Sequence, residues 1–101
     1  MKLTREGVIK KLKDQQSFLS LEFGIKRIGL FGSYAKGIQT EESDIDIVAE
    51  FNKPIGLRFL DFSNYLENLF NKKTDILTIE GINGIRNPRI AESIKKSIIY
   101  V

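Results

Sequence analysis

The sequence lacks cysteine, histidine and tryptophan, and it has only two prolines among 101 residues. Without cysteine the chain forms no disulfide, no zinc–thiolate site and no iron–sulfur cluster, and it has no thiol nucleophile. Without histidine it has no Ser-His-Asp triad, no imidazole base and no imidazole metal ligand. Any bound metal must therefore be held by oxygen, which favours Mg²⁺ or Mn²⁺, and any general base must be a carboxylate, a lysine or a tyrosine.

Long hydrophobic runs are also missing. No apolar stretch approaches the roughly 18 residues that a membrane-spanning helix needs, and the first residues do not resemble a signal peptide. The composition is 42% apolar and 29% charged, with a net charge of +3, which is typical of a soluble globular protein. We therefore expect one domain over residues 1–101, located in the cytoplasm and without a membrane partner.

The expected elements alternate between helix and strand. This pattern predicts an α/β (α+β) fold with a small mixed sheet, helices mainly on one face and the other face partly open for a site. The expected order is a helix from the Thr4 cap to Gly24, a strand over 25–31, a turn and short helix over 32–37, a strand over 44–51, a helix over 57–70, a strand over 74–79, a helix from the Asn87 cap to about Lys96, and a short closing strand within 97–101.

Asp44-Ile45-Asp46 carries the chemistry. Aspartates two residues apart on a strand project from the same face, with α-carbons roughly 6.5–7 Å apart, so they can converge on a cation. A solvated strand end is the alternative interpretation of such a pair. Asp75 favours the metal site, because it lies in another expected strand, where aspartate is disfavoured; an edge-strand charge that opposes aggregation is the alternative there.

Gly32-Ser33 follows the first strand directly and supplies a candidate phosphate site. Glycine lets backbone approach a ligand closely, a helix N-terminus offers free N–H groups, and the serine hydroxyl adds a donor. Lys36 could neutralise phosphate charge. An ordinary capped turn with a surface lysine is the alternative, and the order of residues does not match a P-loop.

Together these motifs resemble the DNA polymerase β-type nucleotidyltransferase superfamily, which combines Gly-Ser, a spacer, Asp-x-Asp and a distal third carboxylate. The match is close from about Ile28 to Phe51 and looser through Lys73-Thr74-Asp75-Ile76-Leu77 to Val101. The short chain is most similar to minimal nucleotidyltransferases (MNT), including the MntA-type antitoxins of HEPN/MNT toxin–antitoxin modules.

The resemblance implies roles for individual residues. Asp44 and Asp46 would ligate two Mg²⁺ ions (Mn²⁺ being an alternative), Asp75 would hold the catalytic metal, and Gly32 and Ser33 would bind the triphosphate of ATP. The family often has arginines where this chain has Tyr34 and Lys36. Lys36 keeps the positive charge and Tyr34 loses it, so the effect of Tyr34 is left open.

The resemblance further implies a protein adenylyltransferase that moves AMP from ATP to a tyrosine of a small helical HEPN-type toxin, and thereby acts as its antitoxin. Two alternatives stay open: a nucleotidyltransferase acting on a small molecule or an RNA end, and a non-catalytic antitoxin that occludes its partner. Nucleic acid is the less favoured partner, because no aromatic side chains interleave with the basic ones near the C-terminus. The residues leave nucleotide preference and oligomeric state open.

Overall fold

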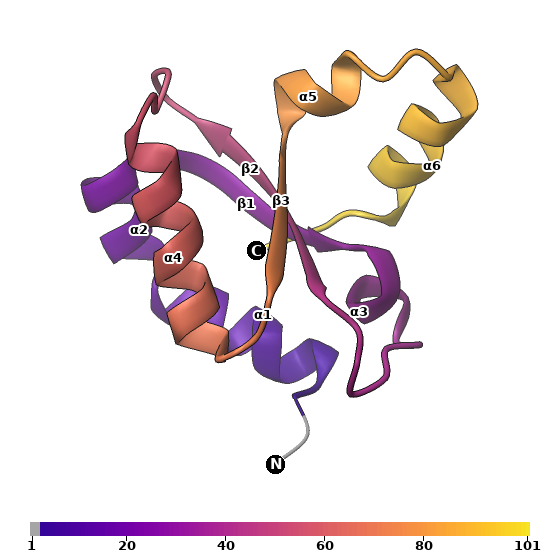
Figure 1. Ribbon diagram of the computed structural model, residues 1–101, viewed down its shortest axis with the longest axis horizontal. Helices are drawn as coiled ribbons and strands as arrows, with labels where there is room; N and C mark the ends of the chain where they lie inside the picture. Colours follow the sequence, from indigo (N-terminus) through magenta and orange to yellow (C-terminus); the bar gives the residue numbers. More distant parts are fainter. Residues whose placement is uncertain (1–2) are drawn as a thin grey trace.

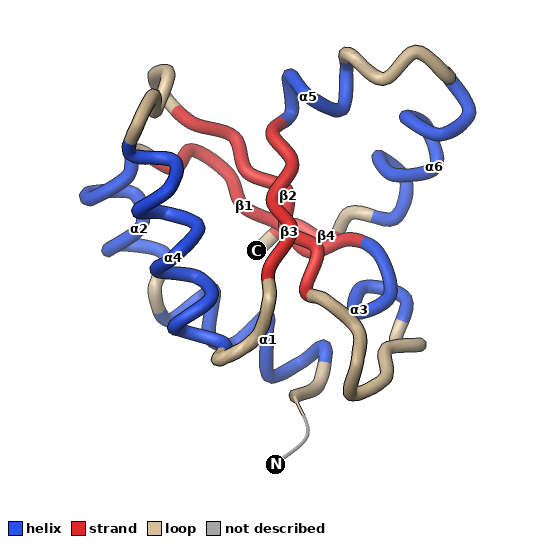
Figure 2. The backbone as a smooth tube through the Cα atoms, viewed as in Figure 1, coloured by secondary structure: helices blue, strands red, loops and turns tan. Residues whose placement is uncertain are grey.

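A four-stranded mixed sheet organises the chain (Figure 1; Figure 2). The structure is a computed structural model that describes residues 3–101. The strands are β1 (Ile25–Phe31), β2 (Ile45–Phe51), β3 (Thr74–Thr78) and β4 (Ile99–Tyr100), in the spatial order β3-β2-β1-β4. β1 runs antiparallel to β2 and to β4, whereas β2 and β3 are parallel. This mixed sheet confirms the predicted fold class.

The N-terminal region forms two helices where the sequence predicts one. Thr4 caps α1 (Arg5–Asp14) by accepting a hydrogen bond from the Gly7 backbone, as expected. The helix ends at Gln15, whose backbone N–H bonds back to α1, and α2 (Gln16–Phe23) then follows at once. Because the apolar spacing continues across the break, the sequence pattern does not reveal it. Gly24 ends α2 in the left-handed conformation, which confirms that part of the prediction.

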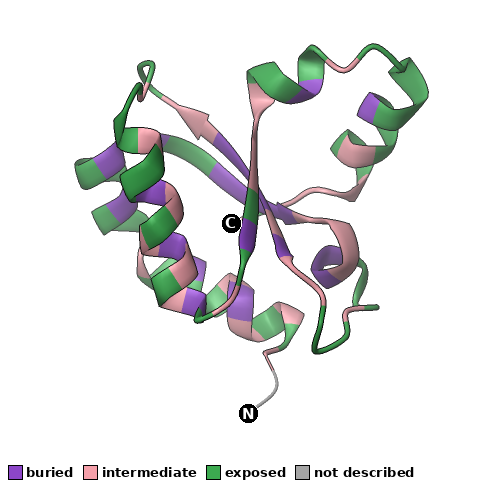
Figure 3. Cartoon of the chain, in the orientation of Figure 1, coloured by how far each residue is buried: buried purple, intermediate pink, exposed green. Residues whose placement is uncertain are grey.

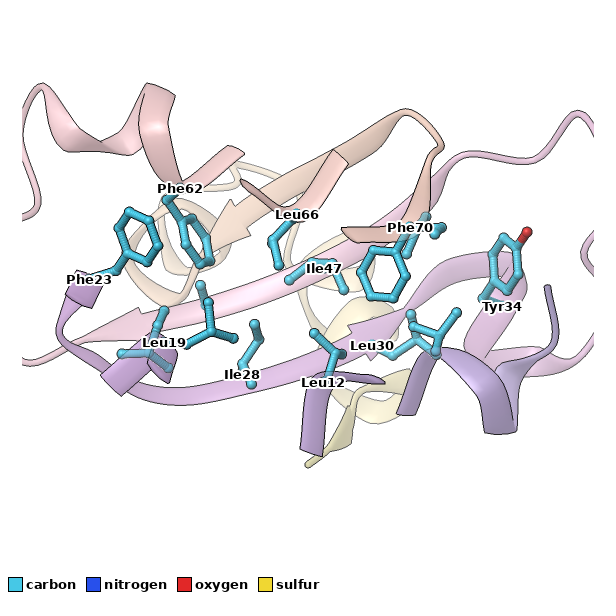
Figure 4. Packing of buried hydrophobic residues seen from close by; sticks show 14 of the residues in the cluster. Leu12, Leu19, Phe23, Ile28, Leu30, Tyr34, Ile47, Phe62, Leu66 and Phe70 are labelled. Atoms are coloured by element: carbon cyan, nitrogen blue, oxygen red, sulfur yellow. The ribbon is translucent and has the colours of Figure 1, made fainter. Parts of the chain in front are cut away.

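The first face of the sheet packs against α1, α2 and α4 (Arg58–Phe70), which lie together on one side of the strands in Figure 1. α4 is the crossover that parallel pairing of β2 and β3 requires. Figure 4 shows its side chains Phe62 and Leu66 facing Ile28 and Ile47 of the sheet. Phe62 is completely buried, and its ring lies 5.3 Å from Phe23 and 5.4 Å from Phe51 between centroids.

Helices cover part of the second face, which agrees with the prediction that this face is partly open. α5 (Ile79–Asn83) and α6 (Pro88–Ser97) pack there, and Ile82 and Ala91 bury Val48 of β2. Figure 3 shows that the rest of this helical pair is largely exposed. The sequence pattern does not predict α5, because residues 80–86 show no clear periodicity and the strand predicted over 74–79 extends one residue too far. Thr78 instead ends β3 and caps α5 by accepting a hydrogen bond from the backbone N–H of Gly81.

The C-terminal elements follow the prediction closely. Asn87 caps α6 through its side-chain oxygen, and Pro88 occupies the first turn.

α3 (Gly32–Lys36) forms the predicted short helix after β1. Within residues 3–101, no helix is long and apolar enough to cross a membrane.

Replacing Phe62 with alanine tests whether this aromatic cluster holds α4 on the sheet. A buried Phe→Ala change costs about 3–5 kcal/mol, so we expect the thermal midpoint to fall by more than ~10 °C. Leu60→Ala on the same helix is the matched control, because Leu60 is 68% exposed and should change the midpoint little. Equal losses in the two variants, measured by calorimetry, would contradict the described packing.

Candidate functional site

Strand register brings two of the three predicted aspartates side by side. Asp46 of β2 pairs with Asp75 of β3 on one side and with Phe31 of β1 on the other. Neighbouring strands lie about 4.8 Å apart, so the two carboxyl groups project from adjacent positions of one face. Side chains alternate along a strand, and Asp46 therefore shares the second face with Val48. The aspartates lie at the start of β2 and β3, beyond the part that Ile82 and Ala91 bury.

Asp44 occupies the residue before β2, not its first position as the sequence predicts. The strand begins at Ile45, whose backbone N–H donates to the carbonyl of Lys73 at 3.1 Å. Asp44 itself is partly exposed, and its Oδ2 lies 3.7 Å from the ammonium of Lys73. The sequence pattern does not indicate a role for Lys73, since a lysine beside a strand is ordinarily a surface residue.

Gly32 touches the Asp46 carboxylate. Its φ of +73° lies in the left-handed region, and a β-carbon placed on it would stand 2.1 Å from Asp46 Oδ2. Only glycine both adopts this backbone and leaves room for the carboxylate. Figure 1 shows α3, which Gly32 begins, beside the start of β2. The predicted glycine turn and the predicted acidic pair are thus one structural unit.

Negative charge is concentrated at Asp46. Burial raises the pKa of its carboxyl group, and the charges of Asp75 and Asp44 raise that pKa further. Within the described residues, no three acidic side chains converge tightly enough to form a ready metal-binding group. Repelling carboxylates favour a divalent cation, and carboxylate oxygens are the ligands that Mg²⁺ accepts, so these residues fit such an ion once substrate phosphates supply further ligands.

The other residues of the predicted phosphate turn separate into two environments. Ser33 is half-buried and lies in the first turn of α3, directly after Gly32. Lys36 is exposed at the last turn of α3, four residues after Gly32. Tyr34, in contrast, is 2% exposed and packs in the core of the first face, where burial raises the pKa of its hydroxyl. Tyr34 therefore contributes packing, and its side chain does not extend into the solvent where an arginine could meet phosphate.

The family profile of nucleotidyltransferase domains matches residues 8–101, which includes every predicted site residue. The chain belongs to this nucleotidyltransferase family. It is accordingly an enzyme of the nucleotidyltransferase kind, as the sequence motifs predicted.

The chain is similar in sequence to two proteins named as protein adenylyltransferases. The nucleotidyltransferase is 32% identical over 100 residues to the protein adenylyltransferase MntA of Thermococcus cleftensis, with 98% of this chain and 97% of the relative covered. It is 42% identical over 93 residues to a Methanocaldococcus jannaschii protein whose name assigns it provisionally as a protein adenylyltransferase, with 89% and 90% covered.

Solved structures show the same fold. One, assigned provisionally as a minimal nucleotidyltransferase, has a TM-score of 0.74 at 27% identity and covers 95% of this chain and 94% of its own. Another, described as a toxin–antitoxin with AMP-PNP, has a TM-score of 0.63 at 20% identity and covers 97% and 72%. These likenesses confirm that the chain is an MNT-like nucleotidyltransferase.

Asp46→Asn should stabilise this nucleotidyltransferase at neutral pH in the absence of divalent cations. The raised pKa means that the folded state holds the Asp46 proton more tightly than the unfolded state does. Its ionised form therefore opposes folding at pH 7, and the amide removes that opposition. As the pH falls through the carboxyl range, wild-type Asp46 becomes protonated and the gain should disappear.

Thermal midpoints measured from pH 7 down to about pH 3, below the usual aspartate pKa of about 3.9, check this expectation. Asp61→Asn is the control, because this exposed carboxylate lies 3.8 Å from Arg58 and should not stabilise when neutralised. A lower midpoint for Asp46→Asn at pH 7 would contradict the electrostatic account.

Gly32→Ala should abolish nucleotide transfer, because its methyl group displaces the Asp46 carboxylate. Gly24→Ala is a matched control: Gly24 has a φ of +71°, but no atom lies within 4 Å of its added β-carbon. Both variants pay a backbone strain of about 1–2 kcal/mol. Only Gly32→Ala should lose activity in an assay of nucleotide transfer at a temperature where both are folded; equal retention of activity would show that the contact with Asp46 is unimportant.

Proposed function

We propose that this enzyme transfers AMP from ATP to a tyrosine hydroxyl of a separate, helical HEPN-type toxin, and so acts as an antitoxin. The observation that carries the proposal is the placement of Asp46 between Asp75 and Gly32, which joins the acidic groups to the predicted triphosphate turn. The full-length similarity to the protein adenylyltransferase MntA supports a protein acceptor. The fold likeness to the toxin–antitoxin structure is compatible with it.

In the proposed reaction, Gly32 and Ser33 bind the β- and γ-phosphates, and Lys36 supplies positive charge at the far end of α3. Asp44, Asp46 and Asp75 hold two Mg²⁺ ions, which would lower the pKa of the acceptor hydroxyl and neutralise the leaving pyrophosphate. The tyrosine oxygen forms a bond to the α-phosphorus, and the bond from that phosphorus to the bridging oxygen of pyrophosphate breaks. The hydroxyl proton passes to Asp75 or, through it, to water.

A free tyrosine hydroxyl ionises only near pH 10, so the proposed reaction at neutral pH requires Asp75 to help remove the proton of this hydroxyl. Asp75 is exposed and stands on β3, the edge strand of the sheet, so a second protein can approach it directly. An edge position suits a bulky acceptor better than a small molecule, which would need an enclosing pocket. This exposure is the feature that favours a protein substrate over a small one.

Asp75→Asn should abolish AMP transfer while leaving the partner bound, because the amide keeps the shape and removes the charge. The measurement is the intact mass of a HEPN-type toxin from the same organism after incubation with this enzyme, ATP and Mg²⁺. Asp61→Asn, with its carboxylate on the outer side of α4, should transfer normally.

Two outcomes would contradict the proposal. A partner that gains no nucleotide from the wild type but is still neutralised would leave occlusion as the mechanism. A partner that gains nucleotide equally from Asp75→Asn would remove Asp75 from catalysis.

A further inference from the structure

Two consecutive lysines tie the segments of the site together. Lys72 and Lys73 lie in the turn between α4 and β3, and β3 then begins with Thr74 and Asp75. The ammonium of Lys72 donates a hydrogen bond of 2.6 Å to the carbonyl of Glu41, in the connection between α3 and β2. The ammonium of Lys73 lies 3.7 Å from Asp44 Oδ2. The turn that leads into the strand of Asp75 is therefore attached to the segment that carries Asp44.

The two lysines have different chemical partners. Lys72 donates to a neutral carbonyl. It therefore connects two loops but does not pair with any of the aspartates of the predicted metal site. Lys73 meets a carboxylate that belongs to the predicted metal site. Its own backbone carbonyl accepts the N–H of Ile45, which fixes the base of the side chain beside β2, while the side chain remains 70% exposed. Such an exposed pair is weak and readily exchanged.

We propose that Lys73 is a resident counter-cation for Asp44, which makes the site select the complex of Mg²⁺ with a triphosphate over free Mg²⁺. The inference rests on the proposed function, because it assumes that Asp44 is a metal ligand. A free Mg²⁺ ion must displace the ammonium and is repelled by it. The complex of Mg²⁺ with ATP carries net negative charge, so the same ammonium attracts it and can leave Asp44 without losing a partner.

This selectivity has a physical basis in the neighbouring charges. Asp46 and Asp75 are adjacent in register, and Asp44 adds a third negative charge close by. Such a group would attract free divalent ions at any time. A lysine at its border lowers that attraction and leaves the attraction of the nucleotide complex intact, so that metal and substrate arrive together. Lys73 is in this sense a positioning residue that acts through Asp44.

Lys73→Gln tests the proposal through binding, independently of the acceptor. In calorimetric titrations with Mg²⁺ alone, we expect about two- to tenfold tighter binding than in the wild type, since one positive charge near the ion is removed. In titrations with Mg²⁺ plus an ATP analogue that resists cleavage after the α-phosphate, affinity should stay the same or fall. Lys73→Arg, which retains the charge, should restore the wild-type values.

Lys72→Gln is the matched control, because it removes an equal charge one residue away that contacts a carbonyl. It should change the Mg²⁺ affinity less than Lys73→Gln does. If both variants bound Mg²⁺ more tightly by the same factor, the change would come from the overall charge of the protein, and the proposal would be overturned. Unchanged or weaker Mg²⁺ binding by Lys73→Gln would overturn it too, as would equal tightening toward free Mg²⁺ and the nucleotide complex.

A failure of the proposed function gives a different pattern. If neither the wild type nor Lys73→Gln binds Mg²⁺, with or without the ATP analogue, both the metal site and the role of Lys73 are wrong. If the metal titrations follow the expectation but no partner protein gains AMP, the role of Lys73 stands and the assigned acceptor is wrong.

Discussion

The contact between Gly32 and the Asp46 carboxylate is the constraint on which the site depends. It brings the end of β1 and the start of β2 so close together that no side chain fits at position 32. Parallel pairing with β3 then places Asp75 beside Asp46. Asp46 thus lies between two neighbours, with Gly32 on one side and Asp75 of the edge strand on the other. Repulsion from the neighbouring carboxylates adds to burial in raising the pKa of Asp46, and a divalent cation bound between them would relieve that repulsion.

The two faces of the sheet have different roles: one face holds the main core, and the other face holds the aspartates. The first face is fully packed by α1, α2 and α4, and this core fixes the register of β1 and β2. The second face is apolar only around Val48, where α5 and α6 cover it. The remaining part of that face, at the start of β2 and β3, holds the aspartates.

The sequence predicts much of this organisation because its signals are local. The Thr4 and Asn87 caps, the glycine after α2 and the apolar stripe of α4 each act within a few residues, and the structure confirms them. What the sequence does not reveal depends on tertiary contacts. The break at Gln15 interrupts a continuous apolar spacing, and the burial of Tyr34 depends on how α3 packs. The pairing of Lys73 with Asp44 joins segments that are far apart in the chain. The roles of the predicted site residues themselves remain predictions.

The most direct test of the account is a crystal structure with Mn²⁺ and an uncleavable ATP analogue, in which anomalous scattering locates the metal. The account predicts metal within about 2.0–2.3 Å of carboxylate oxygens of Asp46 and at least one of Asp44 and Asp75, with phosphate oxygens against Gly32 and Ser33. Metal bound elsewhere, or a triphosphate bound away from the turn between β1 and α3, would contradict the central claim that Gly32 and Asp46 build a single nucleotide and metal site.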